Sequence, residues 1–129
     1  MTTTRTDGTT VLVVDDDPRV LVIVREFLRL SRWTVLEAED TEAGLAVARE
    51  HEGPIHLLIT DVALCGMSGV ELEAQIRRLR PDVRVLFISG SPEGRAVEGT
   101  TLPRGKAYLQ KPFSLASFRA KLEELLSAS

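Results

Sequence analysis

The stretch Val11-Leu12-Val13-Val14-Asp15-Asp16-Asp17-Pro18 predicts a strand that passes directly into a helix. Its apolar, β-branched half is typical of a buried strand, which we expect to span Thr10 to Asp15. Asp17 and Pro18 are residue types favoured at the N-cap and at the first position of a helix. A strand followed so closely by a helix favours an α/β fold.

The same order of strand and helix recurs along the chain. Further strands are predicted at residues 34–38, 55–61, 83–89 and 107–110, and helices at 18–30, 41–51, 69–80, 93–98 and 115–126. Ser68 and Ser114 are expected to cap the helices that follow them. Strict alternation predicts a parallel sheet that is covered by helices on both faces and joined by right-handed crossovers.

Apolar residues at helical spacing mark the helix faces that we expect to cover the sheet. They are Val20, Ile23, Phe27 and Leu30 in the first helix, Leu72, Ile76 and Leu79 in the third, and Leu115, Phe118, Leu122 and Leu125 in the last. The first helix is β-branched enough to resemble a strand, and its face is the reason for preferring a helix. Leu21 and Val22 are expected to be exposed. The short 93–98 helix contains Gly94 and is expected to be the most mobile ordered element.

Composition limits the class of protein. The 129 residues are 43% hydrophobic and 27% charged, which is ordinary for one soluble domain with its own core. A formal net charge of −3 gives no reason to expect direct nucleic-acid binding. Cys65 is the single cysteine, which excludes an internal disulfide and fits the cytoplasm. No segment has the apolar length of a membrane helix, and we expect residues 1–9 to be a disordered tail.

Polar residues stand where four of the predicted strands end. Asp15 and Asp16 follow the first strand, Asp61 ends the third, Ser89 ends the fourth and Lys111 follows the fifth. The carboxyl ends of parallel strands share one edge of a sheet, so these side chains are expected to converge where the strand order reverses.

Three of these residues predict a magnesium site. Asp15, Asp16 and Asp61 supply the hard carboxylate oxygens that Mg²⁺ prefers. Lys111 could pair with Asp61 or with a phosphoryl group, and the Ser89 hydroxyl could donate to a phosphate oxygen. Asp61 is the natural nucleophile, because its attack on phosphorus would give an acyl phosphate. We interpret Asp17 as a helix cap rather than as a third ligand.

Together these stretches resemble the receiver domain of bacterial two-component response regulators. The matching text is Val11 to Pro18, Thr60-Asp61-Val62 with Gly66-Met67-Ser68-Gly69, Leu86 to Gly90, and Tyr108 to Phe113. The last two stretches are similar to receivers of hybrid histidine kinases. The resemblance implies a flavodoxin-like, doubly wound (βα)5 domain over residues 10–127, with a five-stranded parallel sheet in the order 2-1-3-4-5.

The resemblance also implies a role for individual residues. Asp61 matches the phosphoaccepting aspartate, and Asp15 and Asp16 match the acid pair that holds Mg²⁺. The backbone carbonyl of Ala63 matches a further metal ligand, and Ser89 matches the switch hydroxyl. Lys111 matches the family's lysine, whose bond to Pro112 is typically cis. Tyr108 matches the aromatic residue whose rotamer follows phosphorylation.

The function implied is phosphorelay signalling. A sensor histidine kinase or a histidine phosphotransfer protein would phosphorylate the domain, and a downstream protein would bind the face formed by residues 93–98, 107–110 and the last helix. Such a domain is not an enzyme beyond catalysing its own phosphorylation and slow autodephosphorylation. We expect a monomer or a weak, phosphorylation-dependent dimer, either free-standing or excised from a longer protein.

The residues also have two alternative interpretations. A haloacid-dehalogenase-type phosphohydrolase would need a second acid two residues after its nucleophile, where this chain has Ala63. A degenerate receiver would act as a phosphorylation-independent protein-binding module, and the complete set of acids, serine and lysine argues against it.

Two departures from the family pattern fall in the loops around the site. Cys65 replaces a usual proline after Asp61, and Ala63 and Ser91 are too short to orient an attacking water readily. We therefore predict a slowly hydrolysing phosphorylated form.

Overall fold

The five strands form one parallel sheet. The computed structural model describes residues 9–31, 33–62, 68–89 and 107–127. The strands are β1 (Thr10–Val14), β2 (Thr34–Ala38), β3 (Leu57–Asp61), β4 (Arg84–Ser89) and β5 (Ala107–Gln110). They lie in the order β2-β1-β3-β4-β5, and every neighbouring pair is parallel. This is the doubly wound, flavodoxin-like arrangement, and the strand order reverses between β1 and β3.

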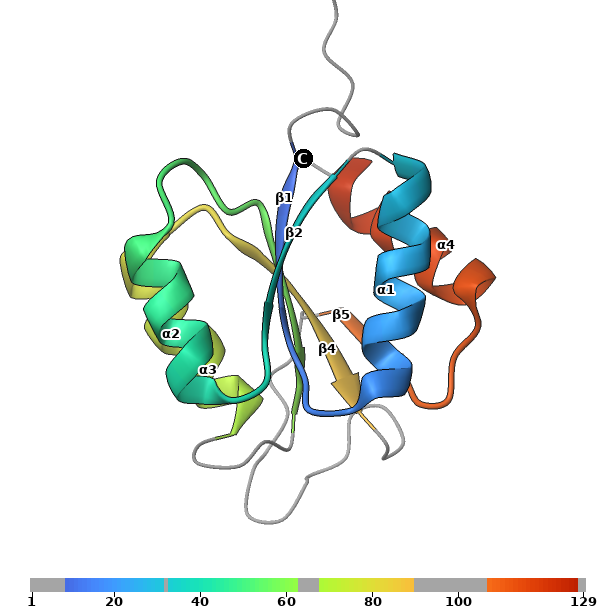
Figure 1. Cartoon of the computed structure of the whole chain (residues 1–129), viewed down its shortest axis with the longest axis horizontal. Helices are drawn as coiled ribbons and strands as arrows, with labels where there is room; N and C mark the ends of the chain where they lie inside the picture. Colours follow the sequence, from blue (N-terminus) through green and yellow to red (C-terminus); the bar gives the residue numbers. More distant parts are fainter. Residues whose placement is uncertain (1–8, 32, 63–67, 90–106, 128–129) are drawn as a thin grey trace, which may run out of the picture.

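Helices cover both faces of the sheet. The described helices are α1 (Pro18–Ser31), α2 (Thr41–Glu50), α3 (Gly69–Leu79) and α4 (Leu115–Ser127). Figure 1 shows α2 and α3 on one face and α1 and α4 on the other. The predicted 93–98 helix lies outside the described residues. Within the described ranges, no helix combines the length and the apolar character needed to cross a membrane.

Alternate strand residues feed two separate cores. Leu12, Val14 and Leu58 belong to the cluster beneath α2 and α3. Val11 and Val13 belong to the cluster beneath α1 and α4. Because both faces are covered, the strands are apolar on consecutive residues rather than alternating with polar ones.

A chain of aromatic rings runs through the α1–α4 side. The ring centroids of Trp33 and Phe27 are 5.2 Å apart, and those of Phe27 and Phe118 are 5.6 Å apart, both edge to face. Phe118 stacks in turn on Phe113 at 5.8 Å. These contacts tie α1 to α4 and to the segment that follows β5.

The predicted helix caps are confirmed. The Asp17 Oδ1 atom accepts from the Arg19 amide, the Ser68 Oγ atom from the Glu71 amide and the Ser114 Oγ atom from the Ser117 amide. The prediction that residues 18–30 form a helix rather than a strand is also confirmed.

Three burial predictions were wrong. Leu79 is 45% exposed and Leu115 is 38% exposed, although both were expected to face the core. Leu79 is the last residue of α3 and Leu115 is the first residue of α4, so both stand at helix ends rather than in the middle of a packed face. Leu21, expected to be exposed, packs in part against the α1–α4 core, whereas Val22 is 54% exposed as expected.

Several strands are shorter than predicted at their ends. β1 stops at Val14, and the next residue, Asp15, makes one further ladder bond, from its amide to the Ala38 carbonyl. β3 begins at Leu57, two residues later than predicted, and the His56 Nδ1 atom just before it accepts from the Thr10 amide. At the chain start, Thr9 is buried and its carbonyl accepts from the Thr34 amide, so this residue of the expected tail belongs to the fold.

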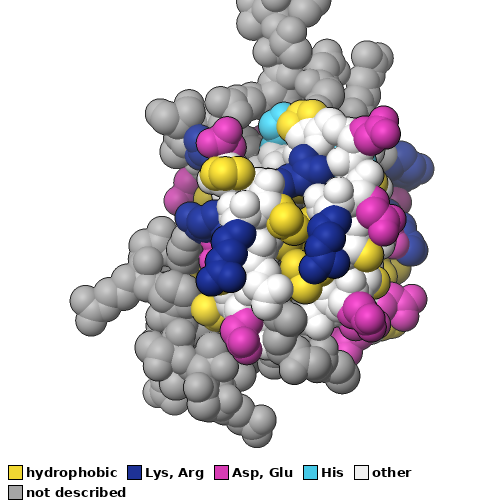
Figure 2. Space-filling model, turned by 90° about the vertical axis from the view of Figure 1, so that its left-hand side faces the viewer, with side chains coloured by type: hydrophobic (Ala, Val, Ile, Leu, Met, Phe, Trp, Pro, Cys, Tyr) yellow, Lys and Arg dark blue, Asp and Glu magenta, His cyan; other side chains and the backbone are white. Residues whose placement is uncertain are grey.

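The outer face of α2 and α3 carries charges of both signs. Figure 2 shows basic and acidic side chains interspersed there, with apolar side chains between them. Below this surface, the buried carboxylate of Glu73 forms an i,i+4 ion pair with Arg77 of the same helix α3. Arg80 donates to the carbonyls of Ala48, His51 and Gly53, which closes the C-terminal end of α2. Sequence patterns gave no sign of this long-range contact.

Candidate functional site

Asp15 is a fully buried carboxylate at the carboxyl end of β1. Its Oδ1 atom accepts from the Asp17 amide at 2.8 Å, which turns the chain towards α1. Its Oδ2 atom is buried and makes no hydrogen bond to any described residue. Burial raises the pKa of Asp15, and the negative charges of Asp61 and Asp16 add to the rise against the opposing hydrogen bond and Lys111.

Asp61 and Ser89 end the adjacent strands β3 and β4. The register pairs Asp61 with Ile88, so Ser89 lies one residue beyond it at the same edge. Both residues are buried, at 9% and 4% exposure. The Ser89 carbonyl accepts from the Lys111 amide at 2.8 Å, which fixes the backbone from which the lysine extends.

Lys111 brings the acids together. Its Nζ atom donates to the Asp61 Oδ2 atom at 2.6 Å and lies 3.6 Å from the Asp15 Oδ2 atom. Burial alone would lower the pKa of Lys111, but the hydrogen bond to Asp61 and the surrounding carboxylates raise it above its usual range. The lysine therefore stays charged, and its bond to Pro112 is cis as the resemblance implied.

The other two acids of the 15–17 run differ from Asp15. Asp16 is exposed beside the site. Asp17 caps α1 and also lies 3.7 Å from the Lys111 Nζ atom. Hydrogen bonds from the Arg19 side chain and amide lower the pKa of Asp17 to about 2, so this carboxylate is charged at neutral pH. The role of Arg19 was not foreseen from the sequence.

The backbone of Asp61 is held from the side of α3. Its carbonyl accepts from the Thr60 hydroxyl at 3.0 Å. The first residue of α3, Gly69, lies against the same carbonyl and donates its amide to Val62 at 2.7 Å. A side chain at Gly69 would overlap the Asp61 carbonyl oxygen, so only glycine allows this close approach.

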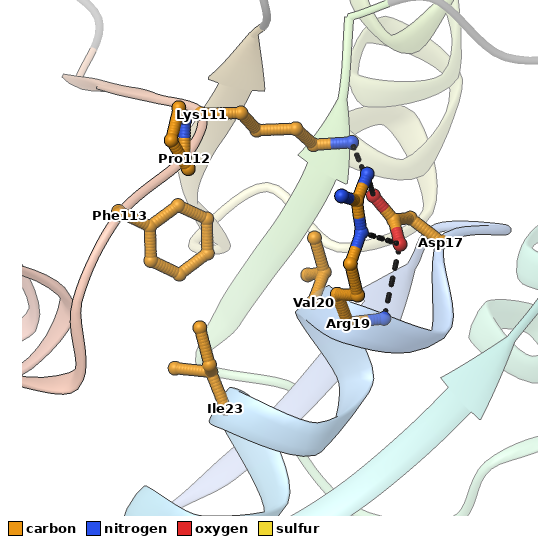
Figure 3. Close-up of a pocket in the computed structure, with 7 residues that line it drawn as sticks. All are labelled: Asp17, Arg19, Val20, Ile23, Lys111, Pro112 and Phe113. Atoms are coloured by element: carbon orange, nitrogen blue, oxygen red, sulfur yellow. Dashed lines mark hydrogen bonds and ion pairs between the residues drawn. The ribbon is translucent and has the colours of Figure 1, made fainter.

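A groove of about 380 Å³ opens beside Lys111, between α1 and the segment after β5. In Figure 3, Val20 and Ile23 of α1 face Pro112 and Phe113. Asp17, Arg19 and Lys111 lie at one end of the groove. The groove is therefore apolar along its length and charged where it meets the acids.

The remaining predicted site residues have mixed outcomes. Tyr108 is buried on β5, and its ring stacks on Phe87 with centroids 5.5 Å apart. Ala63, Cys65 and Ser91 lie outside the described residues. The structure thus brings Asp15, Asp61 and Lys111 into contact, places Ser89 at the same edge and places Tyr108 beneath the α2–α3 face.

The donors present fit Mg²⁺ bound largely through water and phosphate oxygens. Among the described residues, no three His, Cys, Asp or Glu side chains are arranged to hold a metal ion by themselves. Mg²⁺ does not need such a cage, because it usually takes one or two carboxylates and keeps several waters. The buried Oδ2 atom of Asp15, which lies near Lys111 but makes no hydrogen bond within the described part of the chain, is the kind of donor that such an ion uses.

The sequence matches the model of a known protein family. The family model of the response regulator receiver domain matches residues 11–123. The chain belongs to this family. Receivers are the domains of two-component signalling proteins, and the resemblance stated from the sequence is confirmed.

Curated relatives place the receiver in proteins of several lengths. It is 29% identical over 117 residues to the sensor kinase CckA of Brucella abortus, covering 91% of the chain but 12% of that protein. It is 27% identical to the response regulator receiver protein CpdR of the same organism, covering 92% of the chain and 98% of CpdR. It is 28% identical to the transcriptional regulatory protein ResD of Bacillus subtilis and spans 50% of it. The receiver therefore spans half or less of two of these three relatives.

Solved structures agree with the fold. The receiver domain of the hybrid histidine kinase CckA superposes with a TM-score of 0.74 at 31% identity, covering 91% of this chain and 98% of that one. A CheY-like receiver from Methanospirillum hungatei gives 0.78 at 27% identity, covering 94% and 95%.

Proposed function

We propose that this receiver accepts a phosphoryl group on Asp61, with Mg²⁺, and passes the signal on by changing an output surface. The observation that supports this best is the position of the Lys111 Nζ atom, 2.6 Å from the Asp61 Oδ2 atom and 3.6 Å from that of Asp15. A cation held between the Asp61 and Asp15 carboxylates can stabilise negative charge on a group transferred to Asp61.

Asp15, Asp16, Asp61 and the Ala63 carbonyl are the groups that would hold Mg²⁺. When bound, the ion would neutralise charge on the phosphoryl oxygens and orient them towards Asp61. The two acids differ in a useful way, because Asp15 is wholly buried whereas the Asp61 side chain keeps 13% of its surface exposed. This difference supports Asp15 as a ligand and Asp61 as the group that meets the phosphoryl donor.

The chemical step is a nucleophilic displacement on phosphorus. An Asp61 carboxylate oxygen forms a bond to phosphorus while the bond from phosphorus to the donor breaks, and the leaving group keeps its electron pair. Lys111 remains protonated throughout, so it acts by charge and hydrogen bonding rather than by proton transfer. The product is an acyl phosphate that carries roughly one more negative charge than the free carboxylate.

The new charge would draw Lys111 and the Ser89 hydroxyl towards the phosphoryl oxygens. Movement of Ser89 would free space on the strand that neighbours β5, where Tyr108 packs on Phe87. The output surface would then be β5, α4 and the 93–98 segment. A difference of only a few kcal/mol between two conformations is enough for phosphorylation to change their populations.

The partners follow from the family. We propose a sensor histidine kinase or a histidine phosphotransfer protein as the donor, and a downstream protein on the output surface. The place of action would be the cytoplasm. The receiver would catalyse only its own phosphorylation and a slow dephosphorylation, because Ala63 and Ser91 offer an attacking water little help.

Labelling with acetyl phosphate and Mg²⁺ tests the assignment of Asp61. Wild type should gain one phosphoryl group by intact-mass spectrometry, and Asp61→Asn should gain none. Asp82→Asn is a matched control, because Asp82 is an exposed residue just before β4, at the opposite edge of the sheet. Undiminished labelling of Asp61→Asn would rule out the assignment.

A binding measurement separates a working receiver from a degenerate one that only binds proteins. Beryllofluoride mimics a phosphoryl group on a carboxylate and needs no donor. We expect it to bind in a Mg²⁺-dependent way and to shift the NMR signals of Ser89 and Tyr108. A chain that does not bind beryllofluoride but still binds a partner protein would favour the degenerate receiver.

A further inference from the structure

Asp17 does more than cap a helix. Its Oδ1 atom accepts from the Arg19 amide at 2.9 Å and from Arg19 Nε at 3.1 Å, and its Oδ2 atom accepts from Arg19 Nη2 at 3.1 Å. The guanidinium therefore grips both oxygens of the carboxylate. Figure 3 shows this fork, with Lys111 reaching towards the same Oδ2 atom from beyond β5.

Three carboxylates lie close enough to Lys111 to form an ion pair with it. Its Nζ atom is within hydrogen-bond distance of Asp61 at 2.6 Å, and lies 3.6 Å from Asp15 and 3.7 Å from Asp17. Asp15 is fixed by burial in the sheet, but Asp17 stands at the start of a helix with an exposed partner. The Arg19 side chain is 87% exposed and the Asp17 side chain 15%. Without Arg19, the Asp17 carboxylate would attract Lys111 more strongly, because its charge would no longer be balanced by the guanidinium.

We propose that Arg19 is a positioning residue: by holding both oxygens of Asp17, it limits the pull of Asp17 on Lys111 and keeps Lys111 on Asp61. This inference rests on the proposed phosphorylation of Asp61. In this proposal Asp17 competes with Asp61 for Lys111, and Arg19 sets the strength of that competition. Loss of the fork would move Lys111 away from the incoming phosphoryl group without removing any group that contacts it.

The size of the effect follows from the exposure of the pair. Exposed ion pairs couple weakly, so Arg19→Ala should slow labelling at saturating Mg²⁺ and donor by about two- to fivefold. The slowing should shrink as ionic strength rises, because salt screens exposed charges. Thermal stability should barely change, which separates positioning from a fold defect.

A double-mutant cycle tests whether Arg19 acts through Asp17. Asparagine keeps the helix cap but not the charge, so Asp17→Asn removes the competitor. Adding Arg19→Ala to Asp17→Asn should then have little further effect on the labelling rate. Equal slowing in both backgrounds would overturn the proposal, because a general effect of the Arg19 charge would act whether or not Asp17 is charged.

Two further measurements sharpen the test. Arg19→Lys keeps the charge but cannot grip both oxygens, so it should recover less than half of the lost rate, and full recovery would contradict the role of the fork. In metal-free protein, the NMR signal of the Lys111 ammonium should shift in Arg19→Ala and return towards its wild-type position in the double variant. An unmoved signal would overturn the proposal. Wild type that is not labelled on Asp61 would instead defeat the proposed function itself.

Discussion

Replacing Gly69 with alanine should damage both the fold and the phosphorylation site. A Cβ atom at this position would overlap the Asp61 carbonyl oxygen and come within 3.0 Å of its carbon and 3.1 Å of the Thr60 Oγ1 atom. The obstacle is backbone, and it cannot easily yield. The following amide, that of Val62, donates to the Ile88 carbonyl at 2.9 Å, which ties this turn to β4.

The cost can be assembled from two contributions. Overpacking against a rigid wall costs about 1–3 kcal/mol. Moving α3 outwards would also strain the 2.7 Å bond from the Gly69 amide to Val62, which adds about 1 kcal/mol. The free energy of unfolding should therefore fall by about 2–4 kcal/mol, a large part of the 5–15 kcal/mol typical of a domain.

Urea denaturation and labelling measure the two effects. The midpoint of Gly69→Ala should fall by about 1–2 M urea. Its labelling by acetyl phosphate should be slower under conditions where it is folded, because the strand end that carries Asp61 is displaced. Gly44→Ala is the comparison variant: its Cβ would come too close to the Val14 side chain, at 2.9 Å, but the obstacle is a side chain rather than backbone and alanine is the better helix former, so the loss of stability should be smaller than for Gly69→Ala. A Gly69→Ala protein as stable and as reactive as wild type would refute the reasoning.

Three further outcomes are expected. Arg80→Ala should lower the free energy of unfolding by about 2 kcal/mol, because three carbonyls at the end of α2 lose a charged donor, and Arg80→Lys should recover less than half of this in urea denaturation. Mg²⁺ binding measured by calorimetry should weaken as the pH falls from neutral, because the ion needs the charged form of Asp15 and burial raises the pKa of this carboxyl. The weakening should begin above pH 3.8, the ordinary pKa of an aspartate, and an affinity that stays constant down to that pH would contradict this. Phe118→Ala should cost about 3–5 kcal/mol, because this fully buried ring joins α1 to α4, and a smaller loss would mean that the two helices close over the gap.

Local patterns predicted the parts of the fold that local chemistry controls. The caps at Asp17, Ser68 and Ser114 depend on a side chain and an amide two or three residues away, so the sequence is enough to find them. The gathering of Asp15, Asp61, Ser89 and Lys111 at one edge follows from parallel strands, which sequence alternation also reveals.

The rest depends on where elements end in space. Helical spacing places Leu79 on the apolar face of α3, but spacing alone does not show that this face is exposed at the end of the helix. The contact of Arg80 with the end of α2 joins residues about thirty positions apart, and the sequence of neither segment predicts it. For the same reason, Asp17 could be predicted as a cap, but not as a neighbour of Lys111.

The ring chain on the α1–α4 side also makes the protein its own spectroscopic probe. Trp33 is the single tryptophan, and it lies at one end of that chain, in contact with Phe27. Its emission therefore monitors one layer of the sandwich, whereas far-ultraviolet circular dichroism monitors helices on both faces. Coincident unfolding curves from the two signals would mean that the sheet melts with both coverings as one unit. Separate midpoints would show that the helices on one face of the sheet unfold while those on the other face still cover the strands.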